Sequence, residues 1–162
     1  MKPSSTIQAV LILVLIILAS WQFLKIDSLE GEIHELKQPS LYVTMNQLQN
    51  QSHKLFYALE NQNLELVDFY IHELEESAET LIEANVEYHG QPVGELSRTM
   101  LLAPVETLEE AVDDGDWELA NRRYHVLIQS CNTCHVSTGY PAIVIKQPDM
   151  ENPFNIDFSV RE

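Results

Sequence analysis

The 162-residue sequence has little cysteine, glycine and positive charge, and each shortage argues against a class of protein. Its two cysteines, Cys131 and Cys134, are too near each other to close a useful loop, which excludes a disulfide-stapled scaffold. There are only five glycines and no Walker pattern, G-x-S-x-G or H-E-x-x-H, so no phosphate loop or hydrolase motif is available. The sequence has nine basic and 25 acidic residues. The resulting net charge of −16 argues against nucleic-acid binding and favours a basic partner.

An apolar segment stands near the N-terminus. Residues 7–24 form a run of 18 residues without a charge, which is typical of a single membrane span or a signal peptide. The residues around Ala19 and Ser20 fit a cleavage site poorly, and Trp21 and Lys25 resemble interfacial anchors after a span. We therefore expect residues 1–25 to be an uncleaved membrane anchor, with a cleaved signal as the alternative, and the soluble part to face the export side.

A short heptad stripe follows over residues 26–38. Ile26, Leu29, Ile33 and Leu36 recur at spacings of three, four and three, with charged residues around them. This pattern predicts a helical stalk that continues the span, or, alternatively, a stalk that pairs with a second copy. Pro39 should end it.

The body of the chain, residues 40–136, shows apolar residues at helical spacing and no alternating strand pattern. We predict helices over residues 40–60, 64–88, 95–113 and 117–136, with Asn63 and Asp116 at caps and Pro104 disturbing the third helix. Short turns between four amphipathic helices predict an all-α fold, an antiparallel four-helix bundle. Residues 137–162 contain prolines and apolar residues, and we expect an extended arm packed on the bundle.

The last predicted helix ends in Cys131-Asn132-Thr133-Cys134-His135, which is C-x-x-C-H, the attachment signature of haem c. Two thiols one helical turn apart can bond both vinyl groups of one porphyrin, and the adjacent histidine can then be the proximal ligand of the iron. The alternatives are a C-x-x-C redox pair, which lacks its usual βαβ setting, and half a zinc site, which would need two more ligands. One covalently attached haem c would use every cysteine.

With this motif at the end of a fourth helix, the chain resembles the cytochrome c′ fold, and more closely a family of bacterial c′-like monohaem cytochromes. The resemblance covers residues 45–158. Its matching segments are Lys54-Leu55-Phe56-Tyr57-Ala58, Asn63, the acidic pair Glu73 and Glu76, Ser130-Cys131-Asn132-Thr133-Cys134-His135, Ile143-Val144-Ile145, Pro148, Asn152-Pro153-Phe154-Asn155 and Phe158. The departures are Leu59 for a glycine, Leu64 for a tryptophan and Ser130 for a glycine. The resemblance implies a bundle with the haem at one end, and dimers of such bundles pair through the first two helices.

The other face of the iron has one main candidate. In an antiparallel bundle the start of the first helix lies beside the end of the last, so Met45 on the inward stripe is the expected distal residue, as a weak sixth ligand or as an apolar wall. Core packing is the alternative role for Met45, and His89 and His53 are further candidates. Gly139 stands where many c′ proteins carry a basic residue, which leaves Lys54, Arg98, Arg122 and Arg123 as candidates to face the haem propionates.

Three functions fit these features, and none is an enzyme, because the sequence shows no catalytic constellation. The first is a periplasmic electron carrier, tethered to the bacterial inner membrane and exchanging single electrons with redox proteins that have a basic face. The second is a five-coordinate haem protein that binds nitric oxide or carbon monoxide. The third is a structural subunit or sensor that forms a homodimer through its stalk.

Overall fold

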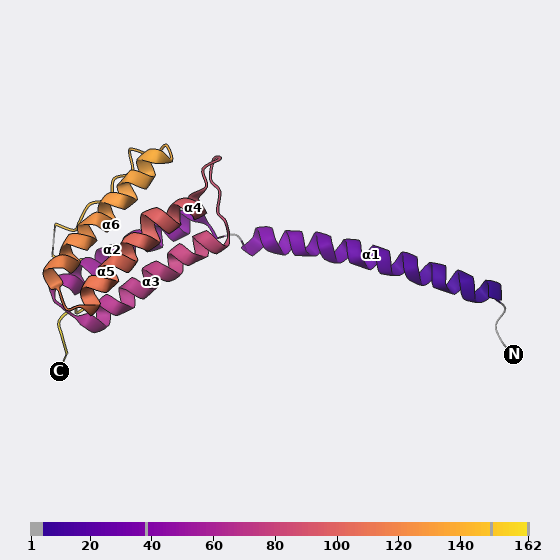
Figure 1. Cartoon of the computed structure of the whole chain (residues 1–162), viewed down its shortest axis with the longest axis horizontal. Helices are drawn as coiled ribbons and strands as arrows, with labels where there is room; N and C mark the ends of the chain where they lie inside the picture. Colours follow the sequence, from indigo (N-terminus) through magenta and orange to yellow (C-terminus); the bar gives the residue numbers. More distant parts are fainter. Residues whose placement is uncertain (1–4, 38, 150, 162) are drawn as a thin grey trace. The chain divides into compact units, whose positions relative to one another are not determined.

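The computed structural model describes residues 5–37, 39–149 and 151–161, and every regular element among them is a helix (Figure 1). The chain divides into two compact units, Met1–Gln38 and Pro39–Glu162. The prediction of an all-helical protein is therefore confirmed for the described residues.

The described residues of the first unit form one helix, α1 (Ser5–Lys37), which runs without a break from the predicted anchor into the predicted stalk. Its segment Ile12–Leu29 has a mean hydropathy of 1.8 over 18 residues, and none of that segment is buried. Such a helix is long and apolar enough to serve as a membrane anchor or as a signal sequence. The side chains of Ile33 and Leu36, in the predicted heptad stripe, lie outside the described residues.

The second unit is built from α2 (Leu41–Glu60), α3 (Leu64–Glu83), α4 (Val93–Ser97), the π-helical turn η1 (Arg98–Leu102), α5 (Ala103–Asp113) and α6 (Trp117–Ser137). α4, η1 and α5 follow one another directly, so residues 93–113 form one helix with a π-turn inside it. Contacts join α2 to α3 and α6, and α5 to α3 and α6. Their shared core contains the fully buried side chains of Leu55, Leu59, Val67, Ile71, Leu74, Leu81, Val105, Leu108, Tyr124 and Leu127.

α3 is shorter than the sequence predicted, because it ends at Glu83 instead of residue 88. Asn85 takes a left-handed conformation with φ +46°, and the N–H groups of Asn85 and Val86 bond back to the carbonyls of Ile82 and Leu81. This is the Schellman pattern of helix termination, with asparagine in the position that glycine usually occupies. The apolar spacing of the sequence continues past this point and therefore did not reveal the end.

The loop from α3 to α4 is a tight hairpin. Tyr88 and Gln91 exchange two backbone hydrogen bonds of 3.0 Å, and His89 and Gly90 between them both have positive φ. After the loop, Gly94 lies so close to α3 that an added Cβ would come within 2.7 Å of the Leu81 carbonyl oxygen. Only glycine fits at this position. The helix starts at Val93, two residues before the predicted start.

The π-turn accompanies Pro104, the residue that was expected to disturb this helix. Proline has no N–H to donate to the carbonyl four residues earlier, and a π-turn takes up one extra residue without breaking the helix. Val93 and Ser97 are buried before the turn, Leu101 is buried within it, and Val105 and Leu108 are buried after it. Three successive spacings of four exceed the ~3.6 residues of an α-helical turn, and the extra residue keeps both halves facing inward.

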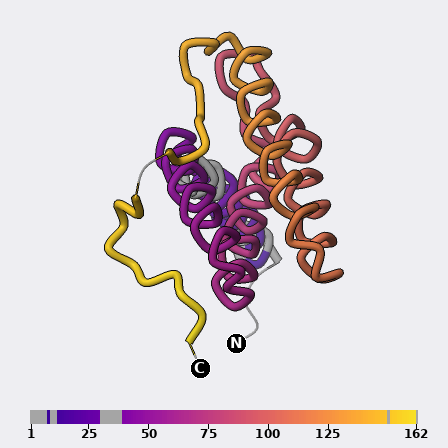
Figure 2. Tube along the Cα trace, turned by 90° about the vertical axis from the view of Figure 1, so that its left-hand side faces the viewer, coloured from indigo at the N-terminus to yellow at the C-terminus, as the bar shows by residue number. Residues whose placement is uncertain are grey.

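Residues after α6 return along the second unit as an extended segment (Figure 2). Asn132 holds it with two bonds, from its Nδ2 to the Ile145 carbonyl at 2.9 Å and from the Ile145 N–H to its Oδ1 at 2.7 Å. Further along, Phe158 is buried and its ring lies 5.6 Å from that of Tyr57. The segment is therefore part of the packed unit and covers the α2 side of it.

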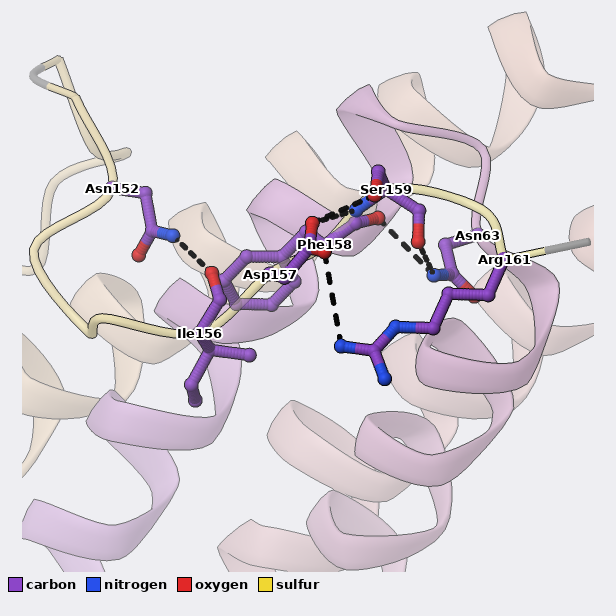
Figure 3. Close-up of polar contacts among 7 residues, drawn as sticks. All are labelled: Asn63, Asn152, Ile156, Asp157, Phe158, Ser159 and Arg161. Carbon is purple, nitrogen blue, oxygen red and sulfur yellow. Dashed lines mark hydrogen bonds and ion pairs between the residues drawn. The ribbon is translucent and has the colours of Figure 1, made fainter.

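Asn63 joins this segment to the start of α3. Its Oδ1 accepts the Leu66 N–H at 3.2 Å, which confirms the predicted cap, and its Nδ2 donates to the carbonyls of Phe158 and Ser159 at 3.1 and 3.0 Å (Figure 3). The side chain is only 8% exposed. One buried amide thus satisfies a helix end and two carbonyls of a segment about 95 residues away in sequence.

Carboxylates of α3 and α5 are close enough to repel one another. Partial burial raises the pKa of Glu75, and Glu109 on α5 raises it further; Glu79 and Glu106 add to this effect while His72 opposes it. Burial and Asp113 likewise raise the pKa of Asp68. These carboxyls are protonated more easily in the folded chain than in the unfolded chain.

We expect the melting temperature to depend on this repulsion. A raised folded-state pKa contributes stability that is present below the unfolded pKa and is lost as the pH rises through the folded pKa. Glu75→Gln should therefore melt above the wild type at pH 7, and the gap should close once the pH falls below about 4. The same charge change at exposed Glu60 is the control. Equal shifts in both variants, measured by circular dichroism from about pH 3 to about pH 8, would contradict the prediction.

Candidate cofactor site

An apolar cavity of ≈ 340 Å³ lies where the start of α2, the start of α4 and the end of α6 meet. Its volume falls within the range of about 300–1,000 Å³ that is usual for small-molecule and cofactor sites. The wall draws on all the helices of this unit except α5, and on the segment after α6. The apolar side chains that line it are Leu41, Met45, Leu48, Leu74, Val93, Met100, Leu101, Leu127, Ile143 and Ile145.

Cys131, Cys134 and His135 all line this cavity, from the last two turns of α6. Both thiols are free. Burial and the neighbouring Cys134 raise the pKa of Cys131 to about 11, and burial raises the pKa of Cys134. Reactive C-x-x-C pairs instead have a lowered thiol pKa, so these surroundings do not favour a redox pair.

The zinc alternative also gains no support from the fold. Among the described residues, no three His, Cys, Asp or Glu side chains are arranged to hold a metal ion. A haem iron makes a smaller demand on the protein, because the porphyrin supplies four nitrogens and the chain needs to add one or two axial ligands.

The imidazole of His135 is oriented by the segment that follows it. Its Nδ1 lies 3.0 Å from the Ile143 carbonyl oxygen, and because a carbonyl only accepts, the ring hydrogen is on Nδ1. The lone pair of Nε2 is then available to a metal. A ligating histidine almost always has this arrangement, with the other ring nitrogen donating to a carbonyl or carboxylate. The donor set therefore fits a haem iron.

Asn132, the first residue between the two cysteines, adds a second link to the same segment. Its side chain holds Ile145, and Ile143 and Ile145 both line the cavity. The motif and the cavity wall that follows it in sequence are thus bonded to each other at two points.

The candidates for the distal side of the iron differ in whether they line the cavity. Met45 lines the cavity from the second turn of α2. His53 does not line it; its Nε2 lies 3.1 Å from the Lys146 carbonyl oxygen, and burial lowers its pKa while that bond opposes the change. His89 is exposed in the hairpin and packs against the Tyr88 ring at 4.3 Å. Among the described histidines, only His135 contributes to the cavity wall.

None of the four basic residues suggested for the propionates lines the cavity. Lys54 lies over the rings of Tyr70 and Phe154, at 5.9 and 5.5 Å. Arg122 forms an ion pair with Glu118 in the first turns of α6, and Arg98 is exposed. The polar groups of the wall, apart from the motif, are neutral: Tyr42, Asn46, Gln49, Ser52, Tyr88, Ser97, Thr138 and Tyr140.

The sequence reasoning missed two features of the wall. Met100, in η1, is a second thioether beside the cavity. Tyr88 and Tyr140 also line the cavity, with rings 5.9 Å apart. Met100 follows Ser97 by three residues, so helical spacing could have indicated it, whereas the meeting of Tyr88 and Tyr140 depends on two irregular segments.

Comparisons with protein-family models, with curated proteins and with solved structures found no match.

Proposed function

We propose that the protein is a c-type monohaem cytochrome that carries single electrons, held at a membrane by α1. The observation that carries this proposal is that Cys131, Cys134 and His135 line one apolar cavity while Nδ1 of His135 donates to a carbonyl. The C-x-x-C-H sequence alone only suggests haem attachment. The cavity beside it supplies the space for such a cofactor, and the oriented imidazole supplies a ligand for its iron.

In this proposal the soluble unit is an antiparallel four-helix bundle of the cytochrome c′ type. Its helices are α2, α3, the joined helix of residues 93–113, and α6. The support is that the cavity lies between the start of α2, the start of α4 and the end of α6, which an up-down-up-down order brings to one end.

Each group of the motif has a role toward the haem. Cys131 and Cys134 would form the thioether bonds, and Nε2 of His135 would be the proximal ligand. When bound, haem c supplies one-electron exchange between ferric and ferrous iron. The apolar wall excludes water, and the Ile143 carbonyl makes the imidazole a stronger donor; burial and hydrogen bonding are the protein's means of setting the potential.

The alternative function is a five-coordinate site that binds nitric oxide or carbon monoxide. One observation favours it: apart from His135, no described histidine lines the cavity, so the thioethers of Met45 and Met100 are the further side chains of the wall best suited to bind ferrous iron. If neither sulfur binds, the sixth position is open to a gas.

We base the proposed partner on the charge of the chain and the proposed location on α1. The net charge of −16 would steer a basic redox partner toward the soluble unit. We place that unit in the bacterial periplasm, anchored at the inner membrane or released if the N-terminal segment is cleaved. Pairing through the stalk or through α2 and α3 would give a homodimer.

The experiment is to express the full chain with a haem c attachment system and measure its haem content and spectra. A covalent haem and a reduced spectrum that carbon monoxide leaves unchanged would support the carrier. A high-spin spectrum that changes with carbon monoxide would support the gas binder. Protein without covalent haem would overturn both.

Met45→Leu is expected to convert a carbon-monoxide-inert ferrous protein into a reactive one. Leucine keeps the size of the side chain but removes the sulfur, so a thioether bond to iron is lost while the cavity stays filled. Met100→Leu makes the same change on another helix and should leave the sixth position unchanged. Carbon monoxide difference spectra and binding rates check this. If Met45→Leu behaves as the wild type does, Met45 is core packing.

A further inference from the structure

Ser130 immediately precedes the haem motif and bonds to a different helix. Its Oγ donates to the Met100 carbonyl oxygen at 2.7 Å, across 30 residues of sequence. The other hydroxyls near the motif bond within α6: Thr133 to the Gln129 carbonyl and Ser137 to the Cys134 carbonyl. Ser130 is therefore the hydroxyl of this region that ties the motif to the helix of residues 93–113.

The acceptor of this bond, the Met100 carbonyl, has lost its usual hydrogen-bond donor because of Pro104. In an α-helix the Met100 carbonyl would accept the N–H of residue 104, and proline has none. The π-turn of residues 98–102 contains Met100, and the N–H of Ala103 bonds to the Arg98 carbonyl, five residues back. Pro104 thus leaves the Met100 carbonyl without its α-helical donor at the point where the helix meets α6, and Ser130 donates to it.

Residues at both ends of this hydrogen bond lie beside the cavity. Met100 and Leu101 line the cavity from η1, and Cys131, next to Ser130, lines it from α6. The bond fixes the distance between the wall formed by η1 and the first thiol of the motif.

We propose that Ser130 is a positioning residue for the haem: its bond to the carbonyl freed by Pro104 holds the π-turn and Met100 against the cofactor. This inference rests on the proposed function. Without the bond, the N-terminal half of the helix would move more freely and admit water to the haem. Water beside the haem favours the ferric form, so the reduction potential should fall.

The test compares Ser130→Ala with the wild type, with Ser130→Thr, which keeps a hydroxyl, and with Ser137→Ala, which removes one that bonds inside α6. In Ser130→Ala we expect amide exchange in residues 93–103 to be roughly five- to tenfold faster, the effect of one lost hydrogen bond. The reduction potential should fall in the same variant. Ser130→Thr should restore both values, and Ser137→Ala should change neither.

Pro104→Ala provides a second arm. Alanine supplies an N–H for the Met100 carbonyl, so the added loss of Ser130 should then have a smaller effect on exchange and potential than it has beside proline. Equal effects in both backgrounds would overturn the link to Pro104.

The outcomes separate this inference from the proposed function. Ser130→Ala with normal covalent haem and an unchanged potential would overturn the inference and leave the cytochrome proposal standing. A wild-type chain without covalent haem would overturn the proposed function, and faster exchange in Ser130→Ala would then show a purely structural bond.

Discussion

On the proposed function, Cys131→Ser combined with Cys134→Ser is expected to abolish covalent haem and to destabilise the second unit by about 4 kcal/mol or more. The cavity would lose the group that fills it, and a ligand present at 1,000 times its Kd contributes about 4 kcal/mol to the folded state. Haem content from the pyridine haemochrome and the protein mass, together with thermal melting by circular dichroism, measures both effects.

Thr133→Ser is the matched control, because Thr133 lies between the two cysteines and is exposed. It should keep its haem and its melting temperature. A double serine variant that melts with the wild type would show that the cavity needs no cofactor for stability.

Asn63→Asp is expected to destabilise the protein by about 2–4 kcal/mol and to release the C-terminal segment. Aspartate keeps the oxygen that caps α3, and a charge at a helix N-terminus is even favourable. It cannot donate to the carbonyls of Phe158 and Ser159, however, and it would place a buried carboxylate beside both oxygens. Two lost hydrogen bonds and a buried charge outweigh the cap (Figure 3).

Urea unfolding gives the stability, and hydrogen exchange over residues 151–161 reports release of the segment. Asn61→Asp makes the same change two residues earlier at an exposed side chain and should cost much less. If both variants lose the same stability, the contacts of Asn63 with the segment contribute nothing. A stability loss without faster exchange would place the effect in α3 alone.

The regular part of the fold follows closely from the sequence. The bounds of α2 and α6 lie within one residue of the predicted ones, because their apolar residues keep helical spacing up to a clear stop signal. Asn63 and Asp116 cap helices as predicted, since a short polar side chain before an apolar run has few other roles. Local signals of this kind need no knowledge of the tertiary structure.

The irregular parts depend on long-range contacts and could not be predicted in this way. The end of α3 follows from a left-handed Asn85, and asparagine in a helical pattern gives no sign of that conformation. The start of α4 depends on the close approach of Gly94 to Leu81, a residue of the preceding helix that is far from Gly94 in the sequence. The π-turn was signalled by Pro104, but proline could equally have produced a kink or a break.

In the candidate site, too, some residues could be predicted from local signals and others could not. Cys131, Cys134 and His135 were evident from their spacing, and the register of α2 was enough to put Met45 near them. Met100 and the neutral lining required the fold, because they depend on which ends of the helices meet. The expectation of a basic residue facing the haem propionates came from the resemblance to c′ proteins, and the four candidates were named only because basic residues are scarce, which says nothing of their positions in the fold.

The hydrogen bond from His135 to Ile143 has a consequence for the order of assembly. Tyr140, Ile143 and Ile145 complete the cavity wall, yet they follow the motif in the chain. During synthesis the motif therefore emerges before the part of the wall that closes over it. On the proposed function, an attachment enzyme would act while the thiols still face solvent, and docking of the last residues would then seal the haem and set the tautomer of its ligand. The C-terminal segment would serve as the final step of maturation.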